Sequence, residues 1–163
     1  MTDLKALIQQ SRLNSVDDEF IGQFHFKTDT NWQFELREDF DTHFHPASVC
    51  EGQNNIAVIL ESPHTYEFAD VNLQLINSDL RVSSRPLNNP RTRIKLIDLL
   101  NGIFIAHLKN TLNNQNTYNL ILINSIQFQC SLGEATNLLR DQVFLWSWID
   151  LKTDFIHRIS RLK

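Results

Sequence analysis

Side chains that can transfer protons and recognise a planar ligand follow two short apolar runs of the chain. Residues 56–60 lead directly into the tetrapeptide 61–64, Glu-Ser-Pro-His, and residues 118–123 lead into Asn124. A carboxylate and an imidazole are the usual groups for general acid–base work. A side-chain amide offers a donor and an acceptor together. The sequence therefore predicts acid–base chemistry or base recognition where these runs end.

The elements that would position these groups form a strand–helix–strand unit. Both runs have the continuous apolar composition of strands buried on both faces of a parallel sheet. Between them, Asn89 and Pro90 signal a helix start, and apolar spacings of three and four predict a helix to about Leu108. Such units are almost always right-handed, with parallel strands. We therefore expect the two strands to be adjacent and their polar ends to meet in one pocket at the sheet edge.

The remaining segments predict helices on both sides of that unit. Helices are expected from about Leu4, from Ser15 with an inner face of Phe20, Ile21 and Phe24, over 134–148, and around 155–162. Alternation at 32–36 predicts a half-exposed strand. The expected fold is α/β, a three-layer α/β/α sandwich around a short, mostly parallel sheet. It forms a single domain over 1–163, with N-terminal helices and a strand in 1–50 and a core over 56–141.

Composition and charge restrict the partners. The chain has 163 residues, 42% of them hydrophobic, and a net charge of −4, which is opposite to that of a dedicated duplex-DNA binder. A basic stretch at 81–95 is either a phosphate contact or a solvated surface. Cys50 and Cys130 lack CxxC spacing and are interpreted as reduced thiols of a cytoplasmic protein. No apolar stretch approaches the ~20 residues of a membrane span, and no signal peptide is recognised, so no membrane partner is expected.

An Asp-x-His-x-His string at 41–45 suggests a metal site. On a strand, His43 and His45 would share one face and could bind zinc. The string resembles the first metal-binding strand of amidohydrolase-type barrels, but such barrels need roughly 250 residues and eight strands. No further ligands stand at fixed spacing. We assign no metal and no cofactor, and keep a metal-dependent hydrolase using His43 and His45 as a remote alternative.

In chain order, three segments resemble motifs of the uracil-DNA glycosylase superfamily. In that family a strand enters a Gly-[Gln/Glu]-x-Pro turn that bears the water-activating group, and residues 60–64 are similar, with Leu60 in place of glycine and Ser62 in place of Asp, Asn or Ala. The family's next helix opens with a Pro-rich, Asn-containing start, as 85–90 does. Its next strand ends in Leu-Leu-Asn, where the Asn reads the base, and 121–124 is similar. The resemblance covers about 56–141, the glycosylase-like core, and does not include the family's last strand and His-containing loop.

The resemblance implies an N-glycosidic hydrolase that acts on a flipped nucleobase in nucleic acid. Because Ser62 cannot activate water as an Asp would, this role passes to other groups. The catalytic candidates are Glu61, His64 and Glu67. The substrate-binding candidates are Ser62, Pro63, Tyr66, Asn124 and Gln127, and the phosphate-binding candidates are Arg85 and Arg91. The alternative is a non-catalytic nucleotide- or protein-binding module with a degenerate glycosylase-like pocket. Nucleic acid or a nucleotide is the expected partner, and no oligomeric state is predicted.

Overall fold

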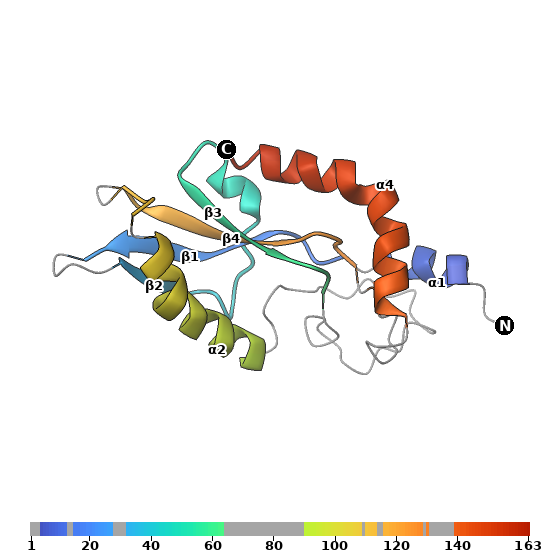
Figure 1. Ribbon diagram of the computed structural model, residues 1–163, viewed down its shortest axis with the longest axis horizontal. Helices are drawn as coiled ribbons and strands as arrows, with labels where there is room; N and C mark the ends of the chain where they lie inside the picture. Colours follow the sequence, from blue (N-terminus) through green and yellow to red (C-terminus); the bar gives the residue numbers. More distant parts are fainter. Residues whose placement is uncertain are drawn as a thin grey trace.

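The computed structural model describes residues 4–12, 15–27, 32–63, 90–108, 110–113, 116–128, 130 and 139–163. They form a mixed α/β fold around a four-stranded sheet in the order β2-β1-β4-β3 (Figure 1). The strands are β1 (Glu19–Phe26), β2 (Trp32–Leu36), β3 (Asn55–Leu60) and β4 (Tyr118–Asn124). The helices are α1 (Leu4–Ser11), the 3₁₀ helix η1 (Ala47–Cys50), α2 (Pro90–Leu99), the π-helical η3 (Leu100–Phe104), α3 (Ile105–Leu108) and α4 (Arg140–Ser160). No helix within these ranges combines the length and apolar character needed to cross a bilayer.

The two apolar runs of the sequence are adjacent, parallel strands, as predicted. The expectation that both are buried on both faces is wrong for β3, which stands at the end of the described strand order and has Ala57 and Ile59 exposed. β3 and β4 pair in register from Asn55 opposite Asn119 to Leu60 opposite Asn124. β1, in contrast, pairs antiparallel with both β2 and β4. The expectation of a mostly parallel sheet is therefore wrong, because only one of the three pairings among the described strands is parallel. β1 and β2 follow each other closely in the chain, and a short connection can join only antiparallel neighbours.

The segment after Ser15, which was expected to be a helix, is strand β1. A bulge in this strand explains the helical spacing of its apolar residues. The register of β1 against β4 shifts between Phe20 and Gly22. An extra residue in one strand changes which side chains share a face. As a result Ile21 and Phe24, three positions apart, both lie in the same core cluster and are fully buried. Their spacing imitated a helical period although the segment is extended.

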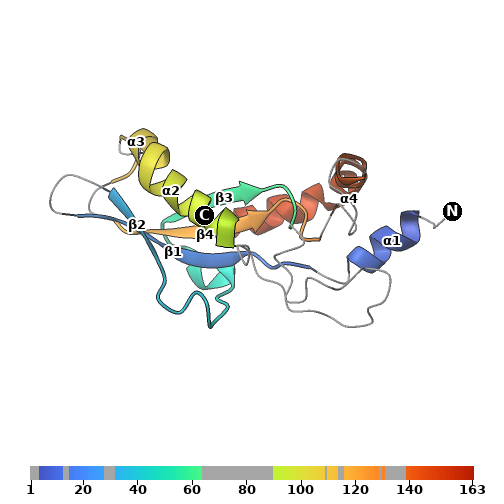
Figure 2. The same cartoon turned by 90° about the horizontal axis from the view of Figure 1, so that it is seen from below.

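The core lies on both faces of β4, in which every residue from Asn119 to Asn124 is buried. On one face, Leu120 and Leu122 belong to the cluster that includes Leu96 and Ile97 of α2. On the other face, Ile121 and Ile123 pack with η1 and with the C-terminal end of the chain. Figure 2 shows α2 and η1 on opposite sides of the sheet. This double coverage explains why the sequence of β4 is continuously apolar.

α4 is one long helix where two were predicted. Its C-terminal half contributes Phe155 and Ile159 to the sheet cluster. Its first half contributes Phe144 and Trp148 to a separate cluster with Ile8 of α1. Figure 1 shows α4 changing direction along its length and α1 lying beside its first half, beyond the end of the sheet. The two packing surfaces face different partners, so the sequence shows two stretches of helical spacing.

Candidate functional site

The carboxyl ends of β3 and β4 are held side by side by backbone hydrogen bonds. The Ser125 amide donates to the Leu60 carbonyl at 2.8 Å, and the Ile126 amide donates to the Glu61 carbonyl at 3.1 Å. The Ser125 hydroxyl also donates to the Leu60 carbonyl, at 2.9 Å. The parallel pairing thus continues one step past both strands. Residues 60–61 and 124–126 therefore lie at the same edge of the sheet, as expected.

Asn124 is buried there with an unused acceptor. Its side chain is 1% exposed, and its Oδ1 has no hydrogen-bond partner among the described residues. The register places it opposite Leu60, so it shares a sheet face with Leu120 and Leu122. A buried polar atom left unsatisfied costs about 1–3 kcal/mol, and in native proteins it calls for a specific explanation such as a functional role.

Glu61, the first catalytic candidate, is engaged by an arginine that sequence reasoning missed. Arg140, at the start of α4, donates from Nε to Oε1 of Glu61 at 2.9 Å and from Nη2 to Oε2. A carboxylate held by two guanidinium nitrogens is not a free general base. Glu61 lies one residue past β3, in a bend, and none of its described side-chain contacts involves Asn124. The geometry does not support one small ligand that touches both side chains.

The rest of the turn packs inward. Pro63 is buried, and Ser62 is half-buried beside Cys130. Burial raises the pKa of the Cys130 thiol to about 11, against the opposing effect of a hydrogen bond with Ser62. A thiol with that pKa has almost no thiolate at neutral pH, so Cys130 is not a nucleophile. Ser62 and Pro63 therefore help to build the turn, and none of their described contacts involves Asn124.

Arg158 of α4 links the carboxyl end of β4 to Asp18. Its Nη1 donates to both carboxylate oxygens of Asp18 at 2.6 Å, and its Nη2 donates to the Asn124 carbonyl at 3.0 Å. Burial raises the pKa of Asp18, although Arg158 acts in the opposite direction. The Gln127 amide lies 3.5 Å from an Asp18 oxygen. Nothing in the local sequence around Arg158 signals this role, because its partners lie far away along the chain.

Gln127 opens into a pocket that lies apart from the side chain of Asn124. The pocket has a volume of about 170 Å³ and is lined in part by Arg12, Ser125, Gln127 and Arg158. Gln127 and Asn124 are thus associated with different surroundings of β4. The two substrate-binding candidates Gln127 and Asn124 therefore do not line one common pocket among the described residues.

Four further candidates, and the side chain of a fifth, lie outside the part of the chain that the structure describes. His64, Tyr66, Glu67 and Arg85 lie outside the described residues. Arg91 lies in the first turn of α2, and its side chain is likewise outside the description.

Arg93, in the basic stretch 81–95, makes contacts that stabilise the fold. It pairs with Asp41, and its guanidinium lies 5.5 Å from the centre of the Phe40 ring. This arginine therefore joins α2 to the loop after β2, and its charge is already partly neutralised.

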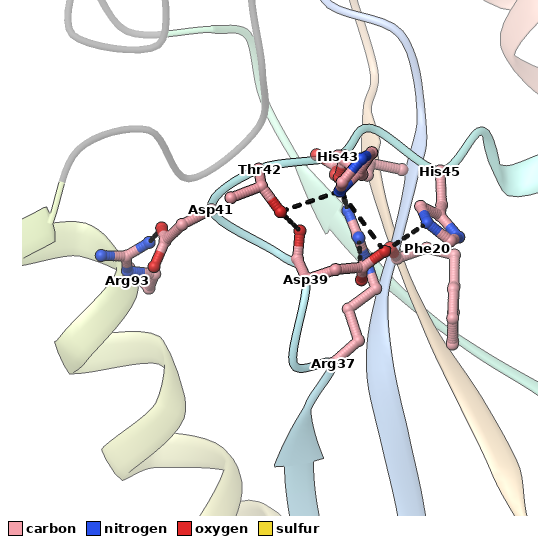
Figure 3. Close-up of polar contacts among 9 residues, drawn as sticks. Phe20, Arg37, Asp39, Asp41, Thr42, His43, His45 and Arg93 are labelled. Carbon is pink, nitrogen blue, oxygen red and sulfur yellow. Dashed lines mark hydrogen bonds and ion pairs between the residues drawn. The ribbon is translucent and has the colours of Figure 1, made fainter.

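The histidine string lies in that loop and not on a strand (Figure 3). His45 Nε2 is 2.9 Å from Oδ2 of Asp39, and His43 Nδ1 is 2.8 Å from the Thr42 hydroxyl. A hydrogen bond from Arg37 lowers the pKa of Asp39. Within the described ranges, no three His, Cys, Asp or Glu side chains gather as metal ligands. The two histidines do not share the strand face that the zinc alternative required.

Arg37 organises this loop. It donates to Glu19 Oε1, to Oδ1 of Asp39 at 2.6 Å, and to the carbonyls of Phe20 and His43. Its side chain is only 8% exposed, and that of Glu19 is fully buried. These contacts attach the loop to β1, so they are structural.

Comparisons with protein-family models, curated proteins and solved structures found no match for this chain.

Proposed function

We propose that this protein is a non-catalytic module that binds a nucleobase or nucleotide through Asn124, within a degenerate glycosylase-like pocket and a three-layer α/β/α arrangement. The observation that carries the proposal is the buried Oδ1 of Asn124, which has no partner in the described part of the chain. It lies at the carboxyl end of the parallel strand pair, where open α/β sheets bind ligands.

The chemistry of that atom defines the ligand. An amide oxygen accepts hydrogen bonds, so the ligand must present an N–H group. A ring N–H beside a carbonyl, as in uracil, thymine or guanine, also gives the amide nitrogen an acceptor. Base-recognising proteins read a flipped base through this Watson–Crick edge.

Binding without catalysis fits the neighbouring groups better than hydrolysis does. Glu61 is paired with Arg140, and Ser62 has no acidic group to activate water. Arg93 is paired with Asp41, and the net charge of −4 gives no general attraction to a polyanion. A single nucleotide or free base is therefore a better partner than duplex DNA.

The decisive experiment compares 1-methyluracil, whose only N–H group is at N3, with 1,3-dimethyluracil, which has no N–H group, by ligand-observed NMR. We expect 1,3-dimethyluracil to bind at least tenfold more weakly. Asn124→Ala should weaken uracil binding by about 1–3 kcal/mol, which is the cost of losing one buried hydrogen bond. Gln127→Ala, which alters the other pocket, should bind uracil normally. Equal binding of the two pyrimidines, or unchanged binding by Asn124→Ala with its fold intact, would overturn the proposal.

A second measurement separates binding from hydrolysis. The protein is incubated with a single-stranded oligonucleotide that contains uracil, and free base is quantified. We expect no release above that of a buffer control. Release that Glu61→Gln abolishes would establish the hydrolase instead.

A further inference from the structure

A second pocket lies between α1 and the first half of α4, away from the sheet. Its volume is about 260 Å³. Its polar and aromatic lining residues are Lys5, Gln9, Arg12, Trp146, Ser147 and Asp150. Figure 1 shows the two helices side by side beyond the end of the sheet, and Ile8 of α1 packs in the same cluster as Val143 of α4. This pocket shares no residue with the Asn124 site.

Ser147 supplies a buried hydroxyl that the described part of the protein does not use. The residue is 1% exposed, and its Oγ has no hydrogen-bond partner there. A serine inside a helix can satisfy its hydroxyl by donating to the carbonyl four residues earlier. Ser147 makes no such bond. Its hydroxyl is therefore an available donor in the pocket wall, and a ligand oxygen would offset the cost of its burial.

The charges around this hydroxyl favour an anion. Among the lining residues that the structure describes, Lys5 and Arg12 are cationic and Asp150 is the one carboxylate. Arg12 Nη2 lies 3.4 Å from Oδ2 of Asp150, with the side chains 37% and 65% exposed. Strong charge-assisted bonds are shorter, about 2.7–2.9 Å, and exposed pairs contribute little. Arg12 can therefore exchange Asp150 for a better acceptor at low cost.

Trp146 adds a flat apolar surface to the same pocket. Its side chain is 54% exposed although it is one of the largest in the chain. An aromatic ring favours offset stacking on another ring, and the gain exceeds that from area alone by about 0.5–1.5 kcal/mol. A ligand with both a ring and an oxyanion would use Trp146 and the cations together.

We propose that this pocket binds a small planar organic anion. Its carboxylate or phosphate accepts hydrogen bonds from Ser147 and Arg12, and its ring stacks on Trp146. The volume lies below the range of about 300–1,000 Å³ that is typical of drug-sized ligands, so a single ring is the expected size. This site is independent of the nucleobase site.

Tryptophan fluorescence of the full chain tests the proposal, with benzoate, phenyl phosphate and neutral benzamide as probes. We expect saturable quenching by benzoate or phenyl phosphate and at least tenfold weaker quenching by benzamide. The tighter of the two anions identifies the preferred oxyanion. Trp146→Phe should remove the quenching, because the other tryptophans, Trp32 and Trp148, do not line the pocket. Equal quenching by benzamide would reduce the site to an apolar surface and overturn the proposal.

Three variants then test the anion contacts. Ser147→Ala and Arg12→Gln should each weaken binding of the preferred anion at least fivefold. Arg161→Gln is the matched control, because Arg161 pairs with Glu51 and does not line the pocket. Circular dichroism confirms that each variant is folded. Unchanged affinity in both folded pocket variants would overturn the proposal.

Discussion

Two polar clusters lie near the carboxyl end of β4, since Glu19 of β1 pairs with Leu122, and they differ in how the buried side chains are engaged. In the Arg37 cluster (Glu19, Phe20, Arg37, Asp39 and His43), one buried guanidinium donates to two carboxylates and two carbonyls. At the carboxyl end of β4, Asn124 is as deeply buried, yet its Oδ1 has no partner among the described residues. The first cluster stabilises the fold through its internal contacts. Glu19 is engaged by Arg37 through Oε1, whereas Asn124 has a single side-chain acceptor and no described residue donates to it, which leaves that acceptor available to a ligand.

The largest expected effect is the loss of the Arg37 cluster. Arg37→Met removes the cation beside Glu19, which is fully buried. Breaking a buried ion pair from one side typically costs 3–5 kcal/mol, because the remaining charge has no compensation. We expect a loss of about 3–5 kcal/mol in the free energy of unfolding, measured in urea. Arg161→Met, at an exposed pair with Glu51, should cost less than about 1 kcal/mol. Similar small losses in both would contradict a structural role for the cluster.

The next effect concerns Cys130, which lies by the turn after β3. Burial raises the pKa of its thiol from the ordinary 9.0 to about 11. The folded protein therefore holds this proton over a pH range in which the unfolded chain releases it. The stabilisation is complete below pH 9.0 and is lost as the pH rises through about 11. We expect the free energy of unfolding to fall by about 2 kcal/mol over this range, at 1.36 kcal/mol per pKa unit.

Cys130→Ala separates this effect from other groups that titrate in alkali. The difference in unfolding free energy between the wild type and the variant should shrink or reverse between pH 9 and 11, the range set by the raised pKa of Cys130. A difference that is constant across this range would mean that the thiol is not protected in the folded state.

A substitution at Gly22 tests the packing of β1 against β2, and we expect a smaller loss of unfolding free energy than for Arg37→Met. A Cβ on Gly22 would lie 2.2 Å from the Glu35 carbonyl oxygen and 2.9 Å from the Phe34 ring. Since the strand backbones must separate to accept it, Gly22→Ala should lower the unfolding free energy by about 1–3 kcal/mol. Gly102→Ala is the control, because nothing lies within 4 Å of its added Cβ. It should be neutral or slightly stabilising in this helical segment. Equal effects of the two substitutions would show that β1 and β2 do not approach closely at Gly22.

The elements around these clusters show which parts of the fold can be predicted from local sequence patterns. β3, β4 and α2 could be predicted because their apolar runs and the start at Pro90 are local signals. β1 could not, because its bulge places Ile21 and Phe24 at a helical spacing on one face.

The candidate site divides in the same way. Asn124 was found because an amide directly follows an apolar strand. Arg140 and Arg158 were missed because Arg140 lies 79 residues from its partner Glu61, and Arg158 lies 34 residues from Asn124. Contacts over such separations come from tertiary packing, which residue spacing does not encode.

The smallest expected effect decides whether Glu61 belongs to the Asn124 site. The side chains of Glu61 and Arg140 are 38% and 39% exposed, so the coupling energy from a double-mutant cycle of Glu61→Gln and Arg140→Gln should be about 0.5–1 kcal/mol. Both carboxylate oxygens of Glu61 accept hydrogen bonds from Arg140, and none of its described side-chain contacts involves Asn124. Glu61→Gln should therefore leave uracil affinity unchanged where Asn124→Ala reduces it. A matching loss of affinity in Glu61→Gln would instead place both side chains on one ligand. The β4 end would then be a joint site in which the ion pair with Arg140 opens on binding.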